Sequence, residues 1–313
     1  MKVERAGPVA DGIVGLTLRP EEPGSLPDFA PGAHIDLNLP NGLVRSYSLL
    51  NDGTSPDRYE IAVSRDAASR GGSTFVCDTL RAGDTLMVAG PRNNFPLAGG
   101  PTPSVLIAGG IGITPIYCMV RHLAREGRPW TLHYSAATRP RAAFLDELAA
   151  LGAEGGGVVT IHIDAEAGGR FLDIGAIVGA AGGDAHFYCC GPAPMLDAFV
   201  AATAGVASAQ VHLERFTADE PAAREGGFTV ELAATGVTLE VEPGKSILDT
   251  VLDAGIDVPF SCTEGTCGTC ETRVIEGIPD HRDAFLTPDE QAGNTLIMIC
   301  CSGSKTLKLV LDL

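Results

Sequence analysis

A set of cysteines late in the sequence has a spacing that binds iron. The pattern C-x4-C-x2-C, followed by an adjacent pair, is formed by Cys262, Cys267, Cys270, Cys300 and Cys301. This is the spacing of plant-type [2Fe–2S] sites, in which four thiolates hold two irons. Gly265 and Gly268 lie between the ligands, where a tightly wrapped loop needs positive φ angles and no side chain. The sequence therefore predicts a one-electron carrier, which needs an electron source upstream and an acceptor outside the chain.

Two short segments near the N-terminus have the composition of a phosphorylated flavin site. In the stretch 45–49, Arg45 offers a bidentate cation, and Tyr47 offers a flat apolar face with a polar tip. In the stretch 69–73, Gly72 lets backbone N–H groups approach a phosphate, and Ser73 adds a hydroxyl and a helix N-cap. Two other interpretations stay open on these residues alone, a solvent-facing strand for the first stretch and an ordinary turn for the second.

Two glycine-containing loops in the middle of the chain could hold a dinucleotide. The loop 109–115, which contains Gly110 and Thr114, lies between an apolar strand and an apolar helix, a place suited to a pyrophosphate. The loop 190–192 follows a second apolar strand. The first loop is not the G-x-G-x-x-G fingerprint of dinucleotide sites, and the position of Cys190 by itself favours a small buried residue at a strand end.

Hydrophobic periodicity divides the chain into three parts that position these residues. Residues 1–98 contain short alternating strands, which predicts an antiparallel β-barrel. Residues 101–217 alternate apolar strands with helices, one of them expected over 142–148, which predicts a doubly wound parallel α/β sheet. Residues 218–226 are predicted to be a linker, and residues 227–313 a small β-grasp unit around the cysteines.

Composition restricts the class of partner. The 313 residues carry a formal net charge of −17, which argues against nucleic acid and anionic membranes as partners. Residues 227–313 hold 14 acidic and 5 basic residues, or −9, which is consistent with a solvated surface or with a docking face for a basic protein.

The N-terminus is charged from the start, and the longest uncharged run is broken by Gly and Pro. We therefore expect neither a secretory nor a membrane segment, and a reducing, cytoplasmic location with thiolate ligands rather than disulfides.

Taken together, the chain resembles the phthalate dioxygenase reductase family, also called class IA oxygenase reductases, and vanillate demethylase reductases are at least as similar. The resemblance covers essentially the whole chain and is most specific in the stretches 45–49, 109–115 and 188–192 and in the cysteine loop. It implies an FMN-binding barrel, an NAD domain and a C-terminal plant-type ferredoxin, in that order.

The resemblance also implies roles for individual residues. It assigns the flavin to Arg45, Tyr47 and Ser48, its phosphate to Gly72 and Ser73, and a place facing flavin and nicotinamide to Thr114. The nicotinamide is expected to lie beside Cys190, Gly191 and Pro192, and Phe216 near the flavin ring. The metal ligands implied are Cys262, Cys267, Cys270 and Cys300.

Three positions depart from the family pattern. Ser64 stands where a basic residue is frequent, and Ala137 stands where an Arg commonly holds the adenosine end of the nucleotide. NADH is therefore expected on family grounds only, and the choice between NADH and NADPH stays open. Cys301 replaces an apolar residue beside the fourth ligand. Aligning Ser302 with the family serine makes Cys300 the ligand, with Cys301 as the alternative.

The function expected from this resemblance is an NADH-dependent reductase component of a two-component, Rieske-type oxygenase system. Electrons would pass from NADH to FMN, to the [2Fe–2S] cluster and to a separate oxygenase. No side chain is expected to act as catalytic acid, base or nucleophile, because the cofactors supply the chemistry. The alternative is a ferredoxin-type carrier or docking module without its own NADH oxidation. The oligomeric state and the oxygenase's substrate cannot be predicted from these residues.

Overall fold

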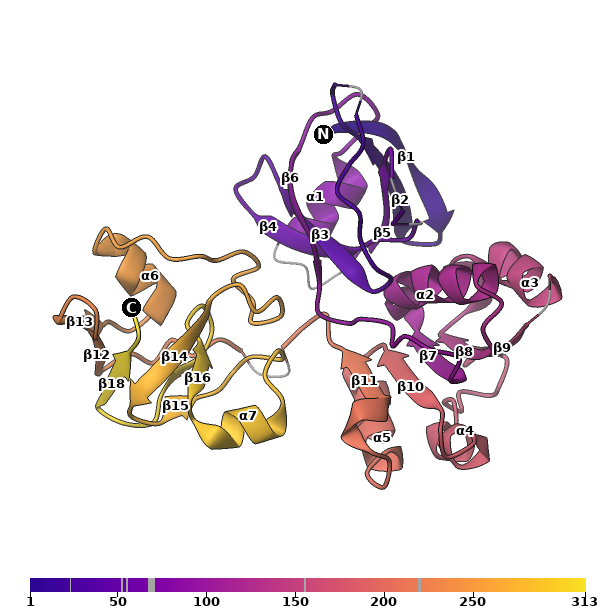
Figure 1. Ribbon diagram of the computed structural model, residues 1–313. Coiled ribbons are helices and arrows are strands. Elements are labelled where there is room, and N and C mark those ends of the chain that lie inside the picture. Colours follow the sequence, from indigo (N-terminus) through magenta and orange to yellow (C-terminus); the bar gives the residue numbers. More distant parts are fainter. Residues whose placement is uncertain (23, 52, 55, 67–70, 155, 219–220) are drawn as a thin grey trace. The chain divides into compact units, whose positions relative to one another are not determined.

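The computed structural model describes residues 1–22, 24–51, 53–54, 56–66, 71–154, 156–218 and 221–313 (Figure 1). Ser69 and Arg70 of the predicted phosphate loop and two residues of the predicted linker lie outside this described part. The chain divides into two compact units, Met1–Glu214 and Arg215–Leu313. The first unit contains both the barrel and the parallel sheet.

The N-terminal part of the first unit is an antiparallel β structure. Two three-stranded sheets have the orders β1-β2-β5 and β4-β3-β6, with every pairing antiparallel. The strands are β1 (Lys2–Ala10), β2 (Ile13–Arg19), β3 (Ala33–Asn38), β4 (Val44–Ser48), β5 (Tyr59–Ser64) and β6 (Met87–Asn93), with helix α1 (Gly72–Asp78) between the last two. Alternate residues such as Leu16, Leu18, Ile35 and Leu37 point into one apolar core. The predicted barrel is confirmed.

The second part of the first unit is a five-stranded parallel sheet of order β11-β10-β7-β8-β9. Its strands are β7 (Ser104–Gly109), β8 (Trp130–Ala136), β9 (Gly157–Ile163), β10 (His186–Cys190) and β11 (Val211–Glu214). Its helices are α2 (Ile113–Arg125), α3 (Leu145–Ala153), α4 (Ile174–Ala180) and α5 (Ala193–Ala202), and its single-turn 3-10 segments are η1 (Gly110–Gly112), η2 (Arg139–Arg141) and η3 (Ser208–Gln210).

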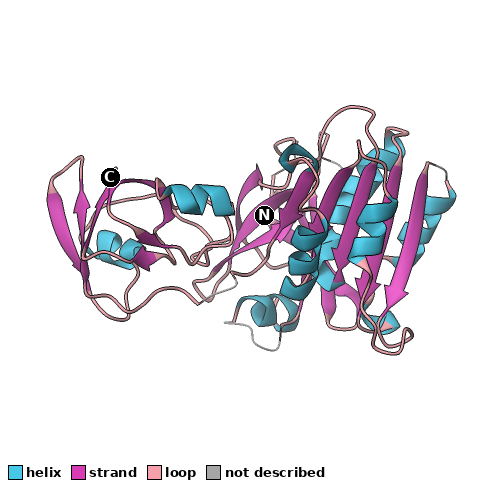
Figure 2. Ribbon diagram, turned by 90° about the horizontal axis from the view of Figure 1, so that it is seen from below, coloured by secondary structure: helices cyan, strands magenta, loops and turns pink. Residues whose placement is uncertain are grey.

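Helices cover both faces of this sheet (Figure 2). Leu106 and Tyr188 on one face pack with α2 and α3, whereas Ile107 and Phe187 on the other face pack with α4 and α5. Both faces are thus apolar, which explains why the strands read as nearly continuous hydrophobic runs. The predicted doubly wound sheet is confirmed. Leu50 and Phe95 of the barrel extend the α2 core, so the two parts of the unit share it.

Helix α3 begins three residues later than expected. Residues Arg139–Arg141 form a 3-10 turn, and Phe144 takes a left-handed conformation with a φ of 63° as the N-cap residue. Phe144 stacks on Tyr117 at a centroid distance of 4.6 Å. This stacking holds the chain out of the helix until Leu145, so the expectation of a helix over 142–148 is only partly correct.

The second unit is a small mixed sheet of order β13-β12-β18-β14-β16, with a two-stranded sheet of β15 and β17 beside it. Its elements are β12 (Phe228–Leu232), β13 (Val237–Val241), α6 (Ile247–Asp253), β14 (Glu271–Glu276), β15 (Pro279–Asp280), α7 (Pro288–Gly293), β16 (Leu296–Met298), β17 (Gly303–Ser304) and β18 (Lys308–Leu311). Strand β12 pairs antiparallel with β13 but parallel with β18. A capping box between Ser246 and Asp249 starts α6.

No helix in the described ranges is both long and apolar enough to cross a membrane.

Candidate functional site

The predicted phosphate residues of the flavin site meet on one side of the barrel. Gly71, with a φ of 101°, leads into α1 at Gly72. A Cβ atom on Gly72 would lie 2.7 Å from Nε of Arg45, so the absence of a side chain lets the arginine pack on the start of the helix. Ser73 follows, and its Oγ accepts a hydrogen bond from Asp66 N at 3.2 Å. A cation and a helix start thus lie together, an arrangement that fits a phosphate.

The other two flavin residues lie on opposite faces of β4. Tyr47 pairs with Ile35 across the β3–β4 ladder and packs at the edge of the barrel core, half-buried. Ser48 pairs with His34 and points to the other face, because successive strand residues alternate. The structure therefore brings Arg45, Tyr47 and Gly72 to one side and places Ser48 on the other.

The two glycine loops of the parallel sheet come into direct contact. Strands β7 and β10 are neighbours, with Ala108 opposite Cys190. A Cβ atom on Gly112 would lie 2.2 Å from the carbonyl oxygen of Cys190, so the loops touch backbone to backbone. Thr114, in the first turn of α2, is buried and donates its hydroxyl to Ile111 O at 3.0 Å. These loops follow the carboxyl ends of the strands at the point where the strand order reverses, the usual place for a nucleotide in such a sheet.

Met195, a residue that the sequence did not single out, helps to hold these loops together. Cβ atoms built on Gly109 and Gly191 would lie 2.8 Å and 2.6 Å from its Sδ. Pro192, the N-cap of α5, packs against Gly109 as well. Gly110, with a φ of 54°, has open space around its Cα, so its backbone stays accessible to a ligand.

Glu214 is a second residue that sequence reasoning missed. It ends β11 directly beside Cys190 in the parallel register. Its Oε2 is buried and has no hydrogen-bond partner among the residues that the structure describes. Burial raises the pKa of this carboxyl to about 8, so at neutral pH it holds a proton. Burial, together with Glu214, also raises the pKa of the Cys190 thiol well above its usual value. A neutral acid at this place can donate a hydrogen bond to a ligand beside Cys190.

Two histidines lie on the same face, nearer the start of these strands. Nδ1 of His186 lies 3.0 Å from Nε2 of His212, and the rings stack on each other and on Tyr188. Burial and, to a smaller extent, the neighbouring His186 together lower the pKa of His212 to about 4. His212 is therefore neutral at physiological pH.

We expect the first unit to lose stability between pH 6.5 and pH 8. Glu214 is protonated in the fold up to about pH 8 but only up to about pH 4.5 when unfolded, so rising pH favours unfolding by up to about 1.4 kcal/mol per pH unit. His212 acts in the opposite direction below pH 6.5, where the unfolded chain binds the extra proton. Denaturation at each pH gives the free energy of unfolding. The fluorescence of Trp130, the single tryptophan, which is buried in β8, reports the transition. In the Glu214→Gln protein, the free energy of unfolding should fall less steeply above pH 6.5. An unchanged slope would contradict the assignment of this pH dependence to Glu214.

The cysteine loop has the backbone that its spacing predicts. Gly265 and Gly268 have φ angles of 73° and 74°, which confirms the need for glycine there. A Cβ atom on Gly268 would lie 2.4 Å from the ring of Phe285, so the loop also packs closely against the segment that follows β15.

Four buried thiols converge under this loop. Cys262, Cys267, Cys270 and Cys300 are 2–6% exposed. The thiols of Cys267 and Cys300 hydrogen-bond to that of Cys262 and lower its pKa, and Cys300 has the same effect on Cys270. Among the described residues, no group of three or more His, Cys, Asp or Glu side chains is arranged to hold a metal ion. The four thiols meet in pairs, and their spacing in the sequence is that of a two-iron cluster.

The neighbouring thiol of Cys301 has different surroundings. Its Sγ lies under Gly265, where a Cβ atom would approach it to 2.5 Å, and it is directed at Met298 O, 3.8 Å away. It also lies beside the thiol of Cys300. Cys300 thus makes the contacts with Cys262 and Cys270, and Cys301 makes contacts with the back of the loop.

Phe216 belongs to the second unit, whereas the other predicted flavin residues belong to the first. Its side chain is 38% exposed. Its predicted place near the flavin ring stays a prediction.

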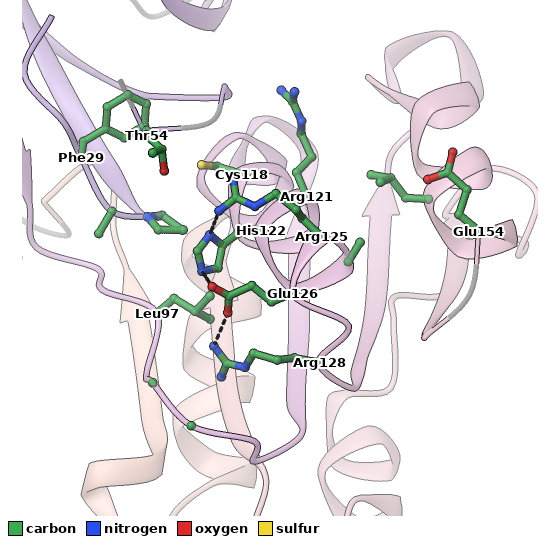
Figure 3. Close-up of a pocket in the computed structure, with 17 residues that line it drawn as sticks. Phe29, Thr54, Leu97, Cys118, Arg121, His122, Arg125, Glu126, Arg128 and Glu154 are labelled. Atoms are coloured by element: carbon green, nitrogen blue, oxygen red, sulfur yellow. Dashed lines mark hydrogen bonds and ion pairs between the residues drawn. The ribbon is translucent and has the colours of Figure 1, made fainter. Parts of the chain in front are cut away.

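A separate pocket of about 860 Å³ lies in the first unit on the outer side of α2 (Figure 3). None of the predicted site residues lines it. Its cations are engaged by the protein itself, because Arg121 donates to Leu50 O at 3.0 Å and Arg128 to Ala98 O at 2.8 Å. His122 lies between Arg125 and Glu126, at 3.0 Å and 3.1 Å. These contacts tie α2 to the barrel and to the segment that joins it to the sheet.

The chain matches two known domain families and is similar over nearly its whole length to known proteins. Residues 230–304 match the 2Fe-2S iron-sulfur cluster binding domain, and residues 106–201 match the oxidoreductase NAD-binding domain. The chain is 50% identical to the phenoxybenzoate dioxygenase subunit beta of Ectopseudomonas oleovorans, over 97% of this chain and 94% of that protein. It is 48% identical to the tetrachlorobenzoquinone reductase of Sphingobium chlorophenolicum, over 100% and 97%.

A solved structure matches the whole chain as well. The structure of a phthalate dioxygenase reductase, described as modular for electron transfer from pyridine nucleotides to [2Fe-2S], superposes with a TM-score of 0.78. The two sequences are 39% identical, and the match covers 100% of this chain and 97% of that one.

Proposed function

Since the chain belongs to the phthalate dioxygenase reductase family, we propose that it is the NADH-dependent reductase component of a two-component oxygenase system. The observation that carries this function is the presence, in one chain, of the four converging thiols and of the paired loops after β7 and β10. A ferredoxin-type carrier without NADH oxidation would need only the first of these. When bound, FMN and the [2Fe–2S] cluster would supply the conversion of a two-electron hydride into single electrons.

The chain's own residues position these groups. Arg45 and the start of α1 at Gly72 would hold the FMN phosphate, and Tyr47 on the same side would contact its ring system. The loops containing Gly110 and Gly191 would hold the nucleotide, with its nicotinamide beside Cys190. Because Gly112 brings these loops into contact, they would hold the nicotinamide in one orientation, which is the chief requirement for hydride transfer.

Cys262, Cys267, Cys270 and Cys300 are proposed as the cluster ligands, and a Rieske-type oxygenase as the electron acceptor. The charge of −9 on residues 227–313 supports docking to a basic surface. Phe260, 43% exposed and two residues before Cys262, offers an aromatic anchor next to the cluster loop.

Anaerobic titration of the purified, cofactor-loaded protein with NADH tests the relay. We expect the flavin absorbance to fall and the cluster absorbance to bleach as NADH is added, since both groups belong to one chain. Bleaching of the flavin alone would rule out transfer between them. A protein that binds no flavin and supports no NADH-driven dye reduction would be the ferredoxin-type carrier.

A second candidate acceptor is a small quinone, because one relative of nearly full-length similarity is a tetrachlorobenzoquinone reductase. NADH oxidation that depends on added quinone and needs no second protein would favour it. NADH-dependent oxygen uptake that requires an added oxygenase would favour the oxygenase system.

A further inference from the structure

A buried carboxylate lies directly behind the cysteine loop and has no role in the site described above. The side chain of Asp283 is fully buried, with an exposed fraction of 0%. Its Cα lies 3.0 Å from the point where Gly265 would carry a Cβ atom, and the thiol of Cys301 lies 2.5 Å from the same point. Asp283 and the neighbour of the proposed fourth ligand therefore contact the same residue of the loop.

This carboxylate shapes the segment that covers the loop. Its Oδ2 accepts hydrogen bonds from the backbone N–H groups of Phe285, at 3.2 Å, and of Leu286, at 2.8 Å. Such a turn is characteristic of an aspartate that bonds to the backbone just after it. The turn directs Ala284 N to Gly265 O at 3.0 Å and lays the ring of Phe285 against Gly268. Both glycines of the loop are thus held by residues that follow the carboxylate.

The other carboxylate oxygen joins this segment to the end of the chain that carries the fourth thiol. Ser302, which is 1% exposed and lies two residues after Cys300, donates its hydroxyl to Oδ1 of Asp283 at 3.4 Å. The same hydroxyl accepts a hydrogen bond from Arg282 N at 3.1 Å. Through its two oxygens, the carboxylate therefore contacts both parts of the chain that supply the proposed cluster ligands.

The surroundings of Asp283 suit a negative charge that water screens little. Its hydrogen bonds come from two backbone N–H groups and a hydroxyl, all of which act as donors to it, as an ionised carboxylate requires. Nδ1 of His281 lies 3.6 Å from Oδ1, and neither ring nitrogen of this histidine has a hydrogen-bond partner among the described residues. A charge buried in this way acts on its surroundings more strongly than a surface carboxylate does.

We propose that Asp283 is a tuning residue, whose buried negative charge lowers the reduction potential of the [2Fe–2S] cluster when the cluster is bound. A reduced cluster carries one more negative charge than an oxidised one, so a carboxylate behind the loop disfavours the reduced form. Net charge and hydrogen bonds near a cluster are among the factors that set its potential. A lower potential makes the cluster a stronger electron donor. This inference rests on the proposed function and deepens it by naming a residue that regulates the electron transfer.

Redox titration of the full, cofactor-loaded chain at one pH, followed by the electron paramagnetic resonance signal of the reduced cluster, tests the proposal. Asp283→Asn removes the charge but keeps the size and one acceptor, and Asp283→Ser removes the charge and caps the turn with a hydroxyl. Both proteins should keep about two irons per chain. In both, the electron equilibrium should shift roughly tenfold toward the reduced cluster, which is about 59 mV upward for one electron.

Asp289→Asn is the matched control, because it removes an exposed charge from the first turn of α7 in the same unit. Water and salt screen that charge, so the potential should stay unchanged. The rate of flavin reduction by NADH should also stay unchanged in all three proteins, since the paired glycine loops lie in the other unit.

An unchanged or lower potential in the neutral variants that hold iron would overturn the proposal. Loss of iron from both neutral variants would overturn it as well, because Asp283 would then be needed for the fold and not for the potential. If one variant loses iron, the potential of the other decides. Failure of the unaltered protein to bind iron, or of NADH to reduce its flavin, would instead contradict the proposed function.

Discussion

Replacing Cys300 with Ser should remove the [2Fe–2S] cluster, whereas replacing Cys301 with Val should leave it in place. The thiol of Cys300 contacts those of Cys262 and Cys270, which makes it the fourth member of the convergent set. A serine hydroxyl is a far weaker metal ligand than a thiolate, because it does not deprotonate near neutral pH. Cys301 is 2% exposed and makes packing contacts with Gly265, a role that an apolar residue of similar size can take over.

Iron and sulfide analysis with visible and electron paramagnetic resonance spectra measures the outcome. The Cys300→Ser protein should hold close to no iron, compared with about two irons per chain before the change. Its flavin should still be reduced by NADH, since the paired loops lie in the other unit. Cluster loss in Cys301→Val with retention in Cys300→Ser would move the fourth ligand to Cys301.

Replacing Gly112 with Ala should nearly abolish NADH-driven flavin reduction while leaving both redox groups bound. The added Cβ atom would lie 2.2 Å from Cys190 O and 2.8 Å from Gly191 N, both of them backbone atoms that no rotamer change can move. The loops after β7 and β10 must then separate, and the nicotinamide loses its position. A displacement of about 1 Å at a reacting centre costs on the order of 100-fold in rate.

Stopped-flow reduction by NADH gives the rate, and the flavin and cluster spectra give the cofactor content. Gly205→Ala is the matched control, because nothing lies within 4 Å of the Cβ position there and its φ is not positive. An unchanged rate of flavin reduction in the Gly112→Ala protein would show that the contact between the loops is not needed for nicotinamide placement.

The parts of this molecule that could be predicted from sequence are those in which the chemistry is local in the chain. The C-x4-C-x2-C spacing predicts a cluster because three ligands lie within nine residues, and the positive φ of Gly265 and Gly268 follows from that confinement. The three-part fold could be predicted as well, since both period-2 strands and buried parallel strands leave distinct hydrophobic patterns.

The parts that could not be predicted arise from contacts between distant segments. Glu214 lies beside Cys190 only because β10 and β11 pair in parallel, and an acid at a strand end carries no signal of burial. Helix α3 starts at Leu145 because Phe144 stacks on Tyr117, which the local sequence does not reveal. Helix α4 was missed altogether, since it is a short run of small apolar residues whose single marker is the Asp173 N-cap.

The order of strands in the second unit has a consequence for biosynthesis. Strand β18 comes last in the sequence of the unit, yet it lies at the centre of the sheet between β12 and β14. The sheet therefore cannot close until residues 308–311 have left the ribosome, while every strand of Met1–Glu214 is synthesised earlier. The first unit can thus fold during translation, before the sheet around the cysteine loop closes.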